Sequence, residues 1–109
     1  MKATITTKGD TVEVNVPLVT YQRGDIFICY CPVLDLMTYS KDEDKLQDYF
    51  DQTLDHFLET NQKHLRQTLE SLGWNMKKPL KSPSNINIPN VDNSKLIHRQ
   101  VNIPSLALA

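Results

Sequence analysis

The sequence predicts an α+β fold: a three-stranded antiparallel meander packed on one main amphipathic helix, then a second short helix and one or two C-terminal strands. Three observations support this prediction. Apolar and polar residues alternate in the N-terminal third of the chain, as they do in half-buried strands. After position 45, apolar residues recur at three- and four-residue spacing, as in a helix that covers a sheet. Beyond position 78, four prolines exclude a long helix.

The chain has 109 residues, of which 39% are hydrophobic and 23% are charged, a composition that suits one domain with one core. We expect residues 1–78 to form the α+β domain. Residues 79–109 should form an extended tail with short strands, which belongs to the same domain or to an interface between subunits. No apolar run approaches the roughly 18 residues of a membrane span, and Met1–Thr4 leads into a polar stretch. The expected location is cytoplasmic.

The first secure strand is predicted at Thr11–Thr20, after a turn signal at Lys8–Asp10. Pro17 cannot donate a ladder hydrogen bond, which favours an edge position or a bulge at that point. The second strand is predicted at Ile26–Cys31. Both of its faces are apolar, so another element or another subunit should cover the second face. A third strand is expected over Val33–Tyr39, antiparallel to the second.

A capping box predicts the start of the main helix. In this motif the Ser40 hydroxyl accepts the backbone N–H of Glu43, and the Glu43 carboxylate accepts the backbone N–H of Ser40. The residues that follow form one apolar stripe, which should cover the sheet. Its members are Leu46, Tyr49, Phe50, Leu54, Phe57 and Leu58.

A second helix should end in a Schellman motif, with Gly73 at positive φ and Trp74 packed back against Leu69. The tail then contains two similar segments that resemble short strands stopped by proline, Ile86–Pro89 and Val101–Pro104. Such strands could pair with sheet edges in the same chain or in a neighbour. A disordered tail is the alternative.

Charge is unevenly distributed, although the formal net charge is only -1. Residues 40–74 contain 4 basic and 8 acidic side chains, whereas residues 75–109 contain 5 basic and 1 acidic. The basic residues of the tail are widely spaced and have no aromatic residues between them, unlike those of a nucleic-acid-binding surface. We expect them to be solvated or to face the acidic helix of the same or another subunit.

No residue is assigned a catalytic, cofactor-binding or metal-binding role. Cys29 and Cys31 share one face of a strand, but a C-x-C pair without a second ligand pair is better explained by two small buried residues. His56 and His64 lack a convincing set of further ligands. The expected protein is not an enzyme and carries no cofactor.

Several segments together resemble the HicB-type antitoxin family: Leu18–Tyr21, Gly24–Ile28, Tyr30–Leu36, the capped helix after Ser40, and Leu72–Trp74. The resemblance covers about two thirds of the chain. It implies a β-β-β-α-β unit, a partial RNase H-like fold, that binds and masks a small HicA toxin, which cleaves mRNA. Many members append a helix-turn-helix or ribbon-helix-helix segment. Here residues 75–109 lack the pair of amphipathic helices that operator binding would need.

Two other classes of function stay open. A metal-dependent RNase H-like nuclease would need clustered carboxylates, for which Asp25, Asp35 and Asp48 are the residues of suitable type. The first is better explained as a turn residue and the second as a polar residue in the short third strand. A stand-alone homo-oligomeric scaffold would need no toxin. In either binding role we expect a homo-dimer or a higher homo-oligomer, assembled through the sheet surface and the C-terminal strand.

Overall fold

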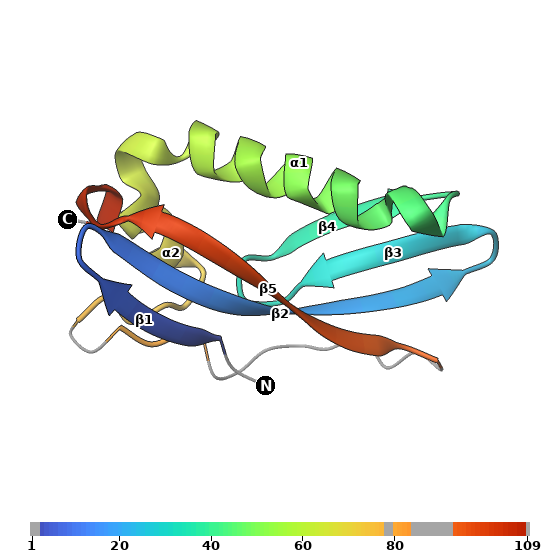
Figure 1. Ribbon diagram of the computed structural model, residues 1–109, viewed down its shortest axis with the longest axis horizontal. Coiled ribbons are helices and arrows are strands. Elements are labelled where there is room, and N and C mark those ends of the chain that lie inside the picture. Colours follow the sequence, from blue (N-terminus) through green and yellow to red (C-terminus); the bar gives the residue numbers. More distant parts are fainter. Residues whose placement is uncertain (1–2, 78–79, 84–92, 109) are drawn as a thin grey trace.

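The computed structural model describes residues 3–77, 80–83 and 93–108. In this part of the chain five strands form one antiparallel sheet, and α1 runs along one of its faces (Figure 1). The α+β class predicted from the sequence is confirmed. The elements are β1 (Thr4–Lys8), β2 (Thr11–Arg23), β3 (Ile26–Cys31), β4 (Leu36–Ser40), α1 (Leu46–Thr60), α2 (Leu65–Ser71) and β5 (Lys95–Pro104).

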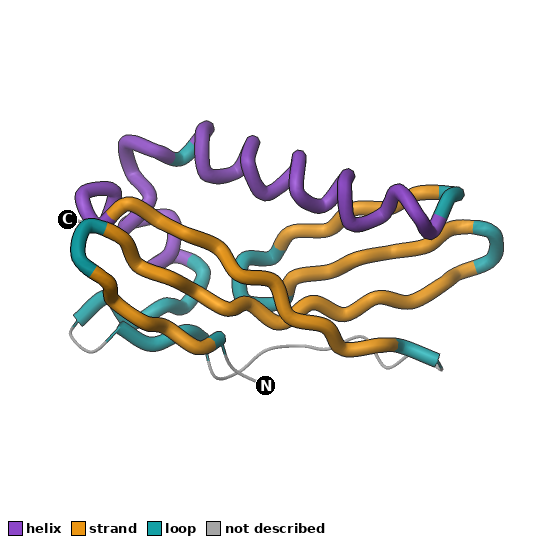
Figure 2. Tube along the Cα trace, viewed as in Figure 1, coloured by secondary structure: helices purple, strands orange, loops and turns teal. Residues whose placement is uncertain are grey.

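Strand β2 is the centre of the sheet, because it pairs with three other strands. Residues 11–20 of β2 pair with β5, residues 11–15 with β1, and residues 19–23 with β3. Since β5 occupies one edge of β2 along both stretches, β1 and β3 share the other edge, one after the other. β4 pairs with β3 and ends the sheet on that side (Figure 2).

Pro17 lies where the second edge of β2 passes from β1 to β3. Among the described residues, positions 16–18 of β2 pair with β5 alone. A residue without an N–H is tolerated where one edge has no ladder partner. The predicted edge position is therefore correct locally, but β2 as a whole is the central strand. It is also longer than the predicted Thr11–Thr20.

The strands on either side of the β3–β4 turn differ in how well they were predicted. β3 has the predicted bounds, but β4 starts at Leu36 and not at Val33. Val33 is buried within the turn, and Asp35 has a φ of 53°. That left-handed conformation interrupts an extended strand, and it suits aspartate better than most residues. The Tyr30 hydroxyl donates to Asp35 Oδ1 at 3.1 Å, which supports the turn.

The predicted capping box is wrong. Ser40 is the last residue of β4, and its Oγ accepts the backbone N–H of Asp42 at 3.0 Å. The N-cap is Asp42, whose Oδ1 accepts the backbone N–H of Asp44 at 3.0 Å. A 3₁₀ turn over Glu43–Lys45 then leads into α1. The strand continues one residue further than predicted, to Ser40, and the N-cap lies two residues later than predicted, at Asp42.

The apolar stripe of α1 packs on the sheet as predicted, with one exception. Phe50 is 1% exposed and is among the largest fully buried side chains, with Leu46 and Leu54 buried beside it. Tyr49 is 38% exposed, so it lies at the margin and not in the stripe. From the sheet, Cys29 and Cys31 belong to the same core.

The Schellman motif at the end of α2 is confirmed. The N–H of Gly73 donates to the carbonyl of Glu70, and that of Trp74 donates to the carbonyl of Leu69, both at 3.0 Å. Gly73 has a φ of 98°. The indole Nε1 of Trp74 donates to the Val33 carbonyl at 2.7 Å. This hydrogen bond joins the end of the helical hairpin to the β3–β4 turn, which explains why both are buried.

The predicted strand at Val101–Pro104 is the last part of the longer β5, whereas Ile86–Pro89 lies outside the described residues. β5 pairs with β2 of its own chain. No helix within residues 3–77, 80–83 and 93–108 has the length and apolar character to cross a membrane.

Replacing Phe50 with alanine should destabilise the fold by about 3–5 kcal/mol, the range for removing a buried aromatic side chain. The neighbouring Tyr49→Ala is the matched control, because this side chain is 38% exposed. It should cost less than about 1 kcal/mol. Urea unfolding of both variants measures the difference, and similar losses would mean that the orientation of α1 is wrong.

Asp42→Ala should destabilise the protein by about 1 kcal/mol through loss of the cap hydrogen bond. Glu43→Ala removes a carboxylate from the same turn without removing that bond, so it controls for charge at the helix start. Thermal or urea unfolding at pH 7 compares the two. A larger loss of stability for Glu43→Ala than for Asp42→Ala would contradict the Asp42 cap and support the predicted capping box.

Candidate interaction surfaces

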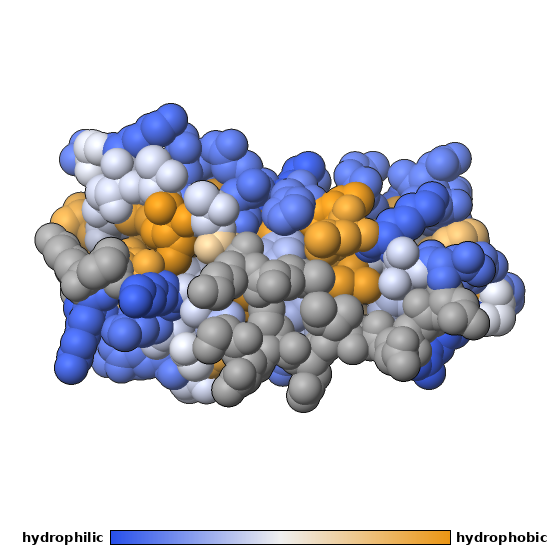
Figure 3. Space-filling model, turned by 90° about the horizontal axis from the view of Figure 1, so that it is seen from below, coloured by the Kyte–Doolittle hydropathy of each residue, from blue (hydrophilic) through white to orange (hydrophobic). Residues whose placement is uncertain are grey.

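On the sheet face opposite α1, two adjoining rows consist of uncharged side chains, whereas Glu13, which is paired with Lys8, and Arg23, which lies over the Tyr21 ring, are found further along β2. The strand pairing aligns these rows across the face: Leu96, Val19, Tyr30 and Met37 in one, and Tyr21, Ile28 and Tyr39 in the other. Val19 and Tyr21 are buried, whereas Met37 is 53% and Tyr39 is 70% exposed. Figure 3 shows hydrophobic residues on this side of the molecule. Both faces of β3 are apolar, as predicted. α1 covers one of them, and the other is partly open to solvent.

Strand β4 is an edge of the sheet, and its side chains alternate between the two faces. The Thr38 hydroxyl donates to Thr53 Oγ1 of α1 at 3.0 Å, so Thr38 faces the helix. Met37 and Tyr39 therefore face the opposite side. Along the edge runs a hollow of about 520 Å³, lined by Met37, Thr38, Tyr39, Tyr49, Gln52, Thr53 and His56.

The two flanks of α1 differ in charge. On the flank beside β4, the lining residues include no carboxylate and no lysine or arginine. On the flank beside β5, Asp51 forms an ion pair with Arg99, and Asp55 lies in the same hollow. Asp48, Asp55 and Glu59 are exposed on the helix. Among the described basic residues of the tail, Arg99 is the one that an ion pair joins to the acidic helix, and it belongs to the same chain.

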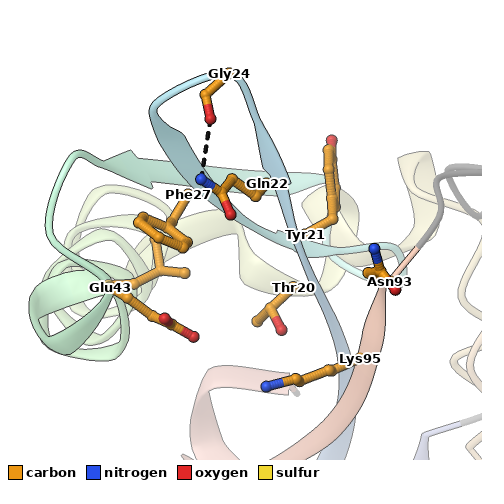
Figure 4. A pocket seen from close by; sticks show the side chains of 9 residues that line it. Thr20, Tyr21, Gln22, Gly24, Phe27, Glu43, Asn93 and Lys95 are labelled. Atoms are coloured by element: carbon orange, nitrogen blue, oxygen red, sulfur yellow. Dashed lines mark hydrogen bonds between the residues drawn. The ribbon is translucent and has the colours of Figure 1, made fainter.

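A second hollow, of about 400 Å³, lies between the start of the helical segment and the ends of β2 and β5 (Figure 4). Glu43 and Lys95 reach it from opposite sides. The amide of Gln22 donates to the Gly24 carbonyl at 2.9 Å and so belongs to the β2–β3 turn. The hollow thus combines an acidic, a basic and a hydroxyl side chain, which are those of Glu43, Lys95 and Thr20.

Both cysteines are free and buried, as the sequence indicated. Burial raises the pKa of the Cys29 thiol from 9.0 to about 12, with smaller contributions from the nearby Cys31 and Asp51. Burial also raises the pKa of Cys31, from 9.0 to about 11. A thiol is nucleophilic only as the thiolate, so neither side chain is activated for chemistry near neutral pH.

The candidate carboxylates for a nuclease lie apart in the sheet. Asp25 is in the β2–β3 turn and Asp35 in the β3–β4 turn, at opposite ends of β3, while Asp48 is exposed on α1. The histidines also occupy separate places: His56 Nε2 lies 3.5 Å from Thr60 Oγ1, and His64 precedes α2. In the part of the chain that the structure describes, no group of three or more such residues could hold a metal ion.

The most exposed apolar residues of the sheet were not singled out from the sequence. Met37 and Tyr39 were assigned to a strand, but their exposure depends on β4 being an edge strand. Alternation within the strand did place them opposite Thr38.

Comparison of the sequence with protein-family models finds no matching family, and neither a curated protein nor a solved structure matches the chain.

The raised thiol pKa values predict a loss of stability at high pH. Between pH 9 and pH 11 the unfolded thiols lose their protons while the folded thiols keep them, so the free energy of unfolding falls as pH rises. The thiol contribution to this fall should be on the order of 1–2 kcal/mol. Urea unfolding across this range, in wild type and in the Cys29→Ala/Cys31→Ala variant, isolates it. Parallel curves for the two proteins would contradict the prediction.

Proposed function

We propose that this protein is a non-catalytic protein-binding module of the HicB antitoxin type, which binds and neutralises a small basic mRNA-cleaving toxin in the cytoplasm. One observation carries the proposal: the exposed side of α1 is acidic. Asp48, Asp55 and Glu59 lie one or two helical turns apart, and a basic protein surface is electrostatically complementary to such a series.

The arrangement around α1 supports a binding role. Among the described residues, the ion pairs engage Glu13, Glu70 and Asp51, and none of them involves Asp48, Asp55 or Glu59. These carboxylates are held on a helix that packs firmly through Phe50. A rigid helix orients its charges before binding, so less conformational entropy is lost when a partner docks.

The order of the elements is a second argument, and it rests on the sequence resemblance. After β1, the chain runs through β2, β3, β4, the two helices and β5. This order is compatible with a β-β-β-α-β unit that has gained a strand at its N-terminus and a second helix. The alternation of three strands and a helix is common to many folds, so the class of partner is argued from charge and not from topology.

The test uses the small protein encoded by the reading frame next to that of this chain. We expect a basic protein with a lone histidine that forms a complex with this chain, measurable by calorimetry. Its cleavage of mRNA should stop in the complex. Asp48→Lys/Asp55→Lys should weaken the complex at least about tenfold, because two attractive charges become repulsive.

Asp10→Lys/Asp25→Lys is the matched control, since it makes the same change in net charge at two exposed turns of the sheet, outside α1. It should leave the affinity unchanged. A neighbouring frame that encodes no small basic protein, or one that does not bind, would reject the antitoxin proposal. Equal losses in the two variants would mean that net charge and not the acidic side of α1 determines binding.

A further inference from the structure

We infer that the free edge of β4 is a self-association surface, at which a second copy of this chain pairs antiparallel and extends the sheet. This proposal is independent of the toxin-binding role, because it uses a different surface. It also differs from the assembly predicted from the sequence, which placed the contact at the sheet surface and the C-terminal strand. β5 pairs with β2 of its own chain over its whole length.

The first argument is the composition of the edges. An exposed edge presents unpaired N–H and C=O groups, and proteins usually protect such an edge with charged residues or proline. β5 carries Lys95, Arg99 and Pro104, and β1 ends in Lys8. β4, Leu36–Ser40, contains no charged residue, no proline and no glycine. Among the described strands it is the edge best suited to pairing.

The second argument is charge at close approach. In an isologous dimer each copy presents the same surface, so any charge on it meets a like charge. The flank of α1 beside β4 contributes Tyr49, Gln52, Thr53 and His56, which include no carboxylate. The acidic residues face outward or toward Arg99. This surface can therefore meet its own copy without repulsion between carboxylates. It has no carboxylate with which a basic partner could form an ion pair.

The third argument is register. Antiparallel pairing about a two-fold axis at Thr38 pairs all five residues of β4 with those of the second copy. It places Met37 of each copy opposite Tyr39 of the other, and sulfur–aromatic contacts of this kind are favourable. The two uncharged rows of the open face then run without interruption from one copy into the next.

Sedimentation equilibrium tests the surface with two substitutions of equally exposed residues. Met37 on β4 and Leu96 on β5 are both 53% exposed. We expect wild type to be in monomer–dimer equilibrium. Met37→Lys should raise the dissociation constant at least about tenfold, since it puts a charge into the apolar row of each copy. Leu96→Lys should leave it unchanged. A wild type that stays monomeric at high micromolar concentration, or a dimer lost only in Leu96→Lys, overturns the inference.

Disulfide trapping tests the register. Directly opposed residues of antiparallel strands have Cα atoms roughly 4.5–5.5 Å apart, a separation that a disulfide bridges. The Met37→Cys/Tyr39→Cys variant should therefore form a covalent dimer on mild oxidation, because each new cysteine faces its counterpart in the other copy. Leu96→Cys/His98→Cys, on the β5 edge, is the control and should stay monomeric on a non-reducing gel. Equal yields from the two variants would indicate random collision and reject the β4 pairing.

Discussion

The pairing of β2 with β5 is the interaction on which the rest of the structure depends. It joins residues 11–20 to residues 95–104, so two segments far apart in the sequence lie side by side in the sheet. Val12 faces Ile103 and Val14 faces Val101, and all four side chains are buried. Because β5 occupies one edge of β2, the strands β1 and β3 have to share the other edge. The N–H of Ser105 donates to the Asp10 carbonyl at 2.7 Å and closes this end of the sheet.

The connection from β4 to β5 determines which face of the sheet is covered. The chain leaves β4 at Ser40 and crosses one face as α1 and α2. The helices cover the face that carries Cys29 and Cys31, and the other face keeps its tyrosines, Met37 and Leu96. Burial of both thiols in a dry core raises their pKa, while alternation along β3 and β4 places uncharged side chains outside. The path of the two helices thus accounts for a buried core with unreactive thiols and for a second face on which apolar side chains stay exposed.

Patterns of neighbouring residues predicted local structure, but they did not determine which distant strands pair. β3 and the Schellman motif at Gly73 were predicted correctly, because a short apolar run and a glycine at a helix end are features of neighbouring residues. β1 was not predicted, since its one apolar residue, Ile5, gives no alternation and the strand exists through pairing with β2. β5 was predicted only at its buried end. Its first half carries Lys95, His98 and Arg99, which suggest a loop until the pairing with β2 is known. For the same reason no pattern identified β4 as an edge, so its exposed side chains could not be assigned a binding role.

The two flanks of α1 allow both proposed interactions in one assembly. Pairing at β4 about an axis perpendicular to the sheet leaves the α1 helices of both copies on the same side of the extended sheet. Asp48, Asp55 and Glu59 of each copy then remain exposed, since the β4 pairing does not involve them. A second acidic helix nearby increases the negative potential that a basic protein meets, which speeds its association. Dimerisation at the uncharged β4 edge would therefore favour binding of a basic partner by increasing the negative potential, although the two surfaces share no residue.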